Sequence, residues 1–293
     1  IDKPALTVLT PISIDHVQFL GNTLAGIADE KAGILKPGVP GIIANQSPVA
    51  LAQIHNRAAE IGAPLVDYGD QGWQVEAAAD GMTVTVDGAE VPCPLPALPG
   101  GHQIDNAGLA VAVLKNLPGF EIDDQAISEG LTATSWPGRL QNLAQSRAAR
   151  HLPEDAELWL DGGHNAASGA ALAETLNAWQ RDDPRPTYLV CGMLNVKDVS
   201  GFMAPFKDRI EGLYGLTIPG EENALPANDI AAQANSAGLQ SHPALSVIDA
   251  LESITSLSKS NIAPRVLICG SLYLAGSVLA NEQGRVKEGG EFS

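Results

Sequence analysis

The chain has 293 residues, of which 45% are hydrophobic and only 4% aromatic, which is enough for two domains with separate cores. It carries 17 Lys and Arg against 34 Asp and Glu, a formal net charge of −17. Such a surface repels phosphate backbones and anionic lipid, so neither nucleic acid nor a membrane is an expected partner. Cys93, Cys191 and Cys269 form no C-x-x-C pair, so no cysteine zinc site or disulfide framework is encoded, and a cytoplasmic location is expected.

The first part of the chain alternates strands with helices. Residues 5–9 and 39–44 are apolar and β-branched, which predicts two buried strands. One helix is predicted over 22–35, and a second over 48–61, where Gly62 closes it. The order strand, helix, strand, helix indicates a parallel sheet.

Period-two alternation replaces this pattern at 72–94. Three short runs, the last two joined at an Asp87-Gly88 turn, predict a small antiparallel sheet appended to the main one. A Pro- and Gly-rich loop follows, and then two predicted helices over 105–115 and 123–134.

The segment Trp136-Pro137-Gly138 is the best candidate for a domain boundary, which predicts one domain over 1–137 and another over 138–293. Strands and helices alternate again after it. The predicted strands are 158–160, 187–190, 212–218 and 265–269, and the predicted helices are 166–179, 199–206, 227–237, 246–258 and one from 271. This order is typical of an open, Rossmann-like α/β sheet.

The common phosphate-binding loops are absent, because neither G-x-x-x-x-G-K-[ST] nor G-x-G-x-x-G occurs. Any phosphate must then be held by helix N-termini, metal ions or single arginines. The chain opens at Ile1 in a segment that already reads as a strand, so we expect a piece of a longer protein.

Three candidate site residues lie in the first part. His16 follows the first strand beside Asp15 and can ligate a metal, or it can simply face solvent. Lys31 falls on the apolar stripe of its helix, where burial would lower its pKa and permit a carbamate; the alternative is a lysine that reaches solvent beside Glu30. Asn106, near a helix start, can read an adenine edge or act as a plain cap.

The second part offers four more candidates. Arg139 follows the predicted boundary and can bind a phosphate or form an inter-domain salt bridge. Asp161 ends a strand, where it can accept ribose hydroxyls, and His164 lies three residues later at the positive end of a helix. Ser271 caps the last helix whether or not it binds a ligand. Cys269 ends an apolar strand without an adjacent base, so it is not expected to be a nucleophile.

Together these motifs resemble the folylpolyglutamate synthase/dihydrofolate synthase family of the Mur ligase superfamily. The resemblance runs along the whole chain and rests, in order, on SIDHVQFLGNTLAGIADEKAGILKPGVP, HQIDNA, WPGRLQ, LDGGHN, CGMLNVKD and CGSLYLAG. It implies the remainder of a central ATP-binding parallel-sheet domain with a small antiparallel sheet, followed by a C-terminal Rossmann-like domain. It also implies a ligase whose substrates are small molecules: ATP, L-glutamate, and dihydropteroate or a folate. The acidic, mostly hydrophilic surface is compatible with a monomer.

The resemblance further implies a mechanism and residue roles. The acceptor carboxylate attacks the γ-phosphate of ATP, and the glutamate amine then attacks the resulting acyl phosphate, with magnesium and fixed donors offsetting the negative charge. The resemblance implies that His16 and a carbamylated Lys31 bind magnesium. It implies that Asn106 contacts the adenine of ATP, Arg139 a phosphate and Asp161 the ribose. His164 and Ser271 are implied to contact the incoming glutamate.

The chain also departs from the family pattern. LDGGHN has Gly where the family usually has Ala, and Ala166 replaces a common Pro. The family's phosphate loop would precede Ile1, so we expect this chain alone not to turn over. Two alternatives stay open: another Mur-type ligase that adds amino acids to a cell-wall nucleotide precursor, and a catalytically silent binding protein that has kept the fold.

Overall fold

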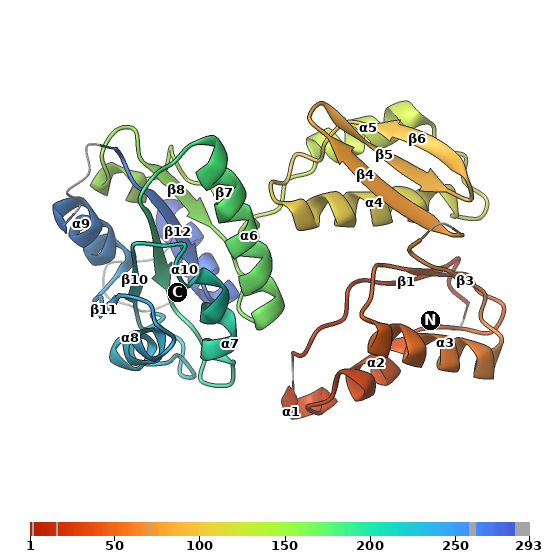
Figure 1. The fold of residues 1–293 in the computed structure, drawn as a ribbon, viewed down its shortest axis with the longest axis horizontal. Coiled ribbons are helices and arrows are strands. Elements are labelled where there is room, and N and C mark those ends of the chain that lie inside the picture. Colours follow the sequence, from red (N-terminus) through yellow and green to blue (C-terminus); the bar gives the residue numbers. More distant parts are fainter. Residues whose placement is uncertain (2, 16, 70, 258–261, 285–293) are drawn as a thin grey trace. The chain divides into compact units, whose positions relative to one another are not determined.

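The computed structural model describes all residues except 2, 16, 70, 258–261 and 285–293. Contacts divide the chain into two compact units, Ile1–Ser135 and Trp136–Ser293. Both are mixed α/β structures, as the sequence predicted (Figure 1). None of the described helices combines the length and apolar character needed to cross a membrane.

The first unit begins with a three-stranded parallel sheet whose strand order is β1-β2-β3. Its elements are β1 (Thr7–Leu9), α1 (Val17–Leu20), α2 (Leu24–Ala32), β2 (Gly41–Ile43), α3 (Pro48–Ile61) and β3 (Leu65–Val66). Local sequence sets the helix ends. The Thr23 hydroxyl accepts a hydrogen bond from Gly26 N at the start of α2, and Gly62 ends α3 in the left-handed conformation, at φ 71°.

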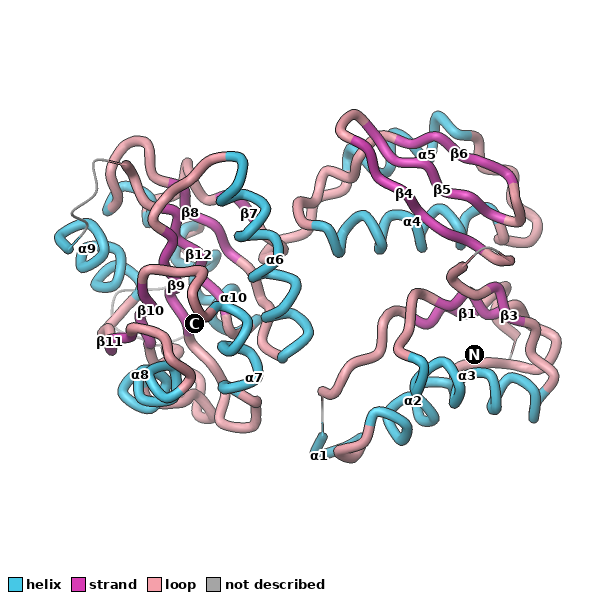
Figure 2. Tube along the Cα trace, viewed as in Figure 1, coloured by secondary structure: helices cyan, strands magenta, loops and turns pink. Residues whose placement is uncertain are grey.

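The small antiparallel sheet follows, with strand order β4-β5-β6. Its elements and the two helices after it are β4 (Trp73–Ala78), β5 (Gly81–Val86), β6 (Ala89–Cys93), α4 (Gly101–Lys115) and α5 (Asp124–Ala133). Figure 2 shows α4 running along this sheet. Ile42 packs with α4 and the antiparallel sheet, whereas Ile43 packs with α2 and α3, so the first sheet is covered on both faces.

The second unit is built on a six-stranded sheet with the order β11-β10-β9-β12-β8-β7, in which only β7 is antiparallel. The strands are β7 (Gln141–Asn142), β8 (Glu157–Leu160), β9 (Thr187–Cys191), β10 (Gly212–Gly215), β11 (Ser241–Pro243) and β12 (Arg265–Cys269). All four strands predicted for this unit are confirmed, although β10 ends at Gly215 rather than at 218.

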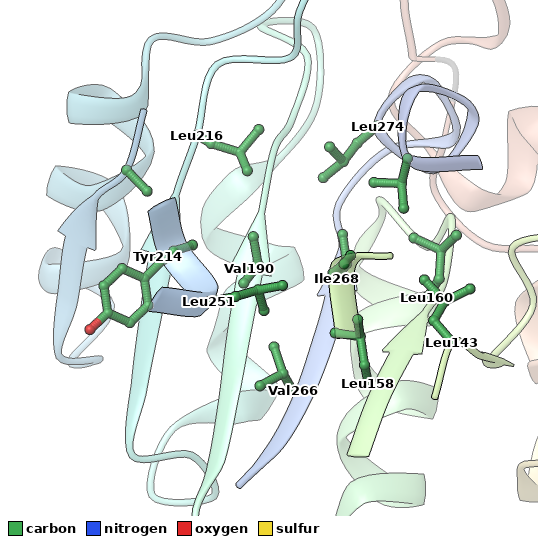
Figure 3. Close-up of a cluster of buried hydrophobic side chains, with 14 of the residues drawn as sticks. Leu143, Leu158, Leu160, Val190, Tyr214, Leu216, Leu251, Val266, Ile268 and Leu274 are labelled. Carbon is green, nitrogen blue, oxygen red and sulfur yellow. The ribbon is translucent and has the colours of Figure 1, made fainter. Parts of the chain in front are cut away.

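Helices cover both faces of this sheet. They are η1 (Ala148–His151), α6 (Ala166–Asp182), α7 (Val199–Met203), η2 (Ala204–Phe206), α8 (Ala227–Ser236), α9 (Val247–Leu257) and α10 (Leu272–Glu282). Figure 3 shows Val190, Val266 and Ile268 in one cluster with Leu251 of α9 and Leu274 of α10. The alternate strand residues face α6, α7 and α8 instead. The loops at the carboxyl ends of these buried strands are therefore held on a rigid base.

Candidate functional site

Three loops meet at the carboxyl edge of the sheet in the second unit. Gly162 N donates to Gly138 O at 2.9 Å, which ties the segment before β7 to the end of β8. Gly270 N donates to Gly163 O at 2.9 Å, which ties the end of β8 to the end of β12. The structure thereby brings four predicted site residues onto adjoining loops: Arg139, Asp161, His164 and Ser271.

Asp161 occupies the centre of this arrangement. Its residue surface is only 5% exposed, and its two carboxylate oxygens accept backbone hydrogen bonds from Leu140 N at 2.9 Å and Gly163 N at 2.6 Å. Leu140 adopts the left-handed conformation, at φ 39°, which is uncommon for a residue with a side chain. The carboxylate thus holds the Arg139 loop against the His164 loop.

His164 precedes α6, whose first turn is closed by a reciprocal capping box between Asn165 and Ser168. Its Nδ1 lies 2.9 Å from the carbonyl oxygen of Gly162. Because a carbonyl only accepts, Nδ1 carries a hydrogen and donates it. In the neutral imidazole, Nε2 is therefore the ring nitrogen that carries the acceptor lone pair.

Ser271 is 3% exposed, and its hydroxyl oxygen accepts a hydrogen bond from Tyr273 N at 3.0 Å, so its predicted role as the α10 cap is confirmed. The capping bond uses the oxygen as an acceptor, and the hydroxyl hydrogen can be donated elsewhere. Gly270 allows this loop to lie close to β9. A Cβ added there would be 2.7 Å from Cys191 Sγ, and the residue has φ 102°.

Arg139 is half-buried beside the same loops. Its Nη1 would lie 3.3 Å from a Cβ added at Gly162, and the Leu272 side chain would overlap that atom. Glycine at 162 therefore lets the guanidinium and Leu272 approach the backbone after β8.

Two cysteine thiols are buried under these loops. Cys191 and Cys269 are paired in register on β9 and β12. The hydrogen bond with Cys191 and burial raise the pKa of the Cys269 thiol well above its ordinary value, and the nearby Asp161 charge adds to this. A raised pKa leaves little thiolate, which agrees with the expectation that Cys269 is not a nucleophile.

The predicted burial of Lys31 is wrong. The buried residues of α2 are Ile27, Ala28 and Ala32, whereas Lys31 is exposed although helical periodicity places it on their stripe. The helix ends at Ala32, so no further turn covers the long side chain, which reaches solvent. Carbamate formation at Lys31 stays a prediction without the support of burial.

Asn106 lies on the first turns of α4, where the helix begins at Gly101 without a side-chain cap. Its interpretation as a plain cap is therefore wrong. Its Nδ2 donates to Gln103 Oε1 at 3.1 Å. The structure does not join Asn106 to Lys31, because α4 and α2 pack on opposite faces of the first sheet.

The described residues do not assemble a magnesium site by themselves. Over the ranges that the structure covers, no three His, Cys, Asp or Glu side chains lie close enough together to hold a metal ion. His16, the predicted metal ligand, falls outside the described residues. Magnesium in nucleotide sites is usually held by one or two protein groups together with phosphates and water, so a bound nucleotide would have to supply part of the ligand set.

Sequence reasoning missed two residues at these loops and one on α4. Leu140 supplies the N–H that Asp161 holds, Leu272 packs over Gly162, and Gln103 binds Asn106. Only Gln103 carries a local signal, since an amide three residues before another on a helix is placed to bond to it. The other two contacts depend on how distant segments meet.

No family model matches the chain, but individual proteins do. It is 32% identical over 307 residues to the dihydrofolate synthase/folylpolyglutamate synthase of Mycobacterium tuberculosis, covering 93% of this chain and 59% of that protein. It is 28% identical over 287 residues to a probable dihydrofolate synthetase of Schizosaccharomyces pombe, covering 94% of this chain and 66% of that protein.

Solved structures are similar over the same extent. Escherichia coli FolC in complex with DHPP and ADP matches with a TM-score of 0.79 at 25% identity, covering 96% of this chain and 62% of that one. A bifunctional folylpolyglutamate synthase/dihydrofolate synthase with Mn, AMPPNP and L-glutamate bound matches with a TM-score of 0.77 at 25% identity, again over 96% and 62%. The chain thus spans between 59% and 66% of the length of these relatives.

Proposed function

Because the chain belongs to the folylpolyglutamate synthase/dihydrofolate synthase family of the Mur ligase superfamily, we propose that it forms part of an ATP-dependent ligase. The protein would join L-glutamate to dihydropteroate, to a folate, or to both, with ATP and magnesium. Related structures that contain ADP, or AMPPNP with Mn and L-glutamate, support this choice of nucleotide, metal and amino acid. The first unit would be the remainder of the central ATP-binding domain, and the second the C-terminal ligase domain.

The observation that carries the proposal is the hydrogen-bonded junction of the three loops at the carboxyl edge of the second sheet. In open α/β sheets ligands bind outside the carboxyl ends of the strands, where loops present their polar groups. Here the junction places a guanidinium, a carboxylate, an imidazole and a hydroxyl on adjoining backbone segments, those of Arg139, Asp161, His164 and Ser271. These groups suit a phosphate, a ribose and an amino acid.

Each group has a proposed role in the two-step reaction. The guanidinium of Arg139 binds a phosphate of ATP, while Asp161 accepts a ribose hydroxyl and keeps the loops aligned. Before the glutamate amine attacks the acyl phosphate it must lose a proton, and in our proposal Nε2 of His164 accepts it. The Ser271 hydroxyl donates to a carboxylate of the same glutamate.

Asn106 would read the adenine from the first unit. Its amide offers both a donor and an acceptor, which is the pattern that the adenine edge requires.

His16 and a carbamylated Lys31 stay proposed magnesium ligands. The carbamate is tested by measuring the mass of the Lys31-containing peptide from the protein. The protein has a net charge of −17, so we propose that it binds small molecules and no nucleic acid. We also propose that it is a cytoplasmic monomer.

The test is ATP-dependent glutamate addition by the full-length protein, followed by the mass of the product. Dihydropteroate and a reduced folate are offered as acceptors, and a UDP-linked cell-wall precursor is the competing substrate. Glutamylation of either pteridine acceptor, with none of the UDP-linked one, is the expected result.

Variants connect the activity to the junction. His164→Ala and Arg139→Ala should each lower kcat/KM by about 100-fold or more, because a positioned base contributes about that much and a buried charge contact a similar amount. Exposed residues of the same kind, His242 and Arg147, supply the matched controls His242→Ala and Arg147→Ala. Equal losses in the controls, or activity on the UDP-linked substrate alone, would contradict the proposal.

A further inference from the structure

We propose that Gln103 is a positioning residue, which holds the side-chain amide of Asn106 in the one orientation that matches adenine. This inference rests on the proposed contact between Asn106 and the base. It concerns the first turns of α4, where two side-chain hydrogen bonds link three residues in series.

The chain of contacts begins at His102. Gln103 Nε2 lies 3.0 Å from His102 Nε2, and Asn106 Nδ2 lies 3.1 Å from Gln103 Oε1. Gln103 is 8% exposed, whereas Asn106 lies at the surface of the same helix. The buried amide is therefore fixed by its surroundings, and the exposed amide is fixed by the buried one.

The orientation of Asn106 matters because its two ends differ chemically. An asparagine amide that turns by 180° exchanges its donor with its acceptor, at little cost when it has no hydrogen bond. With one hydrogen of Nδ2 given to Gln103, the second hydrogen and Oδ1 remain to pair with a base. Adenine offers an amino donor beside a ring acceptor and fits this pattern.

Hypoxanthine distinguishes a fixed amide from a rotating one. On the edge formed by N1 and the 6-substituent, its 6-oxo group replaces the amino donor of adenine and its N1 carries a hydrogen, so the pairing pattern of this edge is reversed. A fixed Asn106 rejects it, while an amide free to turn accepts both bases. The ratio of ATP to inosine triphosphate affinity therefore reports the orientation directly.

The experiment measures binding of both nucleotides by calorimetry to the full-length protein, with the variants Gln103→Met, Gln103→Glu, Asn106→Ala and the double variant Gln103→Met/Asn106→Ala. Methionine keeps the length of glutamine without its polar atoms. We expect Gln103→Met to weaken ATP binding about 3- to 10-fold, the usual cost of ordering one more side chain, and to reduce the ATP preference by at least as much. In the Asn106→Ala background the same change should have no further effect on binding, and Gln103→Glu, which keeps the acceptor, should retain the preference.

The outcomes separate this inference from the proposed function. If Asn106→Ala leaves the ATP preference intact, the adenine contact itself is wrong. If Asn106→Ala removes the preference but Gln103→Met retains both affinity and preference, the positioning role is overturned while the ligase function stands. Should Gln103→Met fail to fold, as thermal unfolding would show, Gln103→Glu decides: equal binding of the two nucleotides by the folded variant overturns the inference.

Discussion

The two edges of the sheet in the second unit each bury one charged side chain, and they satisfy it in different ways. At the amino edge, Arg265 is 2% exposed and donates to Glu157 at 2.6 Å, while its guanidinium carbon lies 5.4 Å from the ring centre of Trp179. At the carboxyl edge, Asp161 is 5% exposed and its described hydrogen bonds come from the backbone of two loops.

This difference separates the structural role of Arg265 from the functional role that we propose for Asp161. An ion pair between side chains stabilises the strands that carry it, and removing one partner leaves a buried charge behind. A carboxylate held by backbone N–H groups instead fixes the course of the loops that carry the proposed ligand-binding groups. We therefore expect the amino edge to govern stability and the carboxyl edge to govern activity.

The largest effect should come from Glu157→Ala at the amino edge. It leaves the Arg265 guanidinium buried without its main counter-charge, so the free energy of unfolding should fall by about 3–5 kcal/mol. Urea unfolding measures the loss, with Glu174→Ala on the exposed face of α6 as the control. At a temperature where the variant is folded, kcat should stay near that of the parent protein. A loss no larger than that of the control would remove the contrast between the edges.

Asp161→Asn should reverse this pattern at the carboxyl edge. The amide nitrogen cannot accept a backbone hydrogen bond, so one of the two loop contacts is lost, at a cost of about 1.5–3 kcal/mol. If that energy serves to align the site, kcat/KM for ATP should fall about 10- to 100-fold. The free energy of unfolding should change less than in Glu157→Ala. The matched control is Asp182→Asn, at an exposed residue of α6. Normal kinetics with a large stability loss would make Asp161 a structural residue like Arg265.

Much of this sheet could be predicted from the sequence, because its buried strands contain short apolar runs, which in β9 and β12 are flanked by Pro and Gly. The bounds of α3 were also predicted, and Gly62 marks its end as expected. The strands β3, β7 and β11 were missed because they have two or three residues and exist only through their partners.

For the candidate site, the sequence predicted the residue types but not the contacts between them. Asp161 and His164 stand in a recognisable local motif, but the bond from Leu140 N to Asp161 spans 21 positions and has no local signal. Lys31 was misplaced because helical periodicity does not say where a helix ends. Contacts between segments, rather than residue types, are what the sequence leaves undetermined.

The pH dependence of stability should also distinguish the two edges. Burial alone raises the pKa of Glu157, but the hydrogen bonds from Arg265 and Trp159 and the charges of Arg265 and Arg185 outweigh it and lower the pKa below its ordinary value. Such a carboxyl contributes stability that is complete above its unfolded pKa, near 4.3, and is lost as the pH falls through the lower folded value. Acid unfolding in this range should therefore be less steep in Glu157→Gln than in the parent. Identical acid profiles would show that the ion pair does not control acid stability.

The smallest effect should come from Gly163→Ala, which crowds the carboxyl edge without removing any hydrogen bond. The added Cβ would lie 2.9 Å from Asp161 Oδ1 and 3.0 Å from both Leu172 Cδ1 and Ser168 Cβ. Alanine gains about 0.4–1 kcal/mol by restricting the unfolded chain, and crowding offsets this, so the free energy of unfolding should change by less than about 1 kcal/mol. The displaced carboxylate should nevertheless raise KM for ATP without lowering kcat. Gly276→Ala in α10, where a Cβ meets nothing within 4 Å, should leave KM unchanged. An unchanged KM in Gly163→Ala would mean that the position of the Asp161 carboxylate tolerates a shift, and the carboxyl edge would then be less sensitive to geometry than its backbone hydrogen bonds indicate.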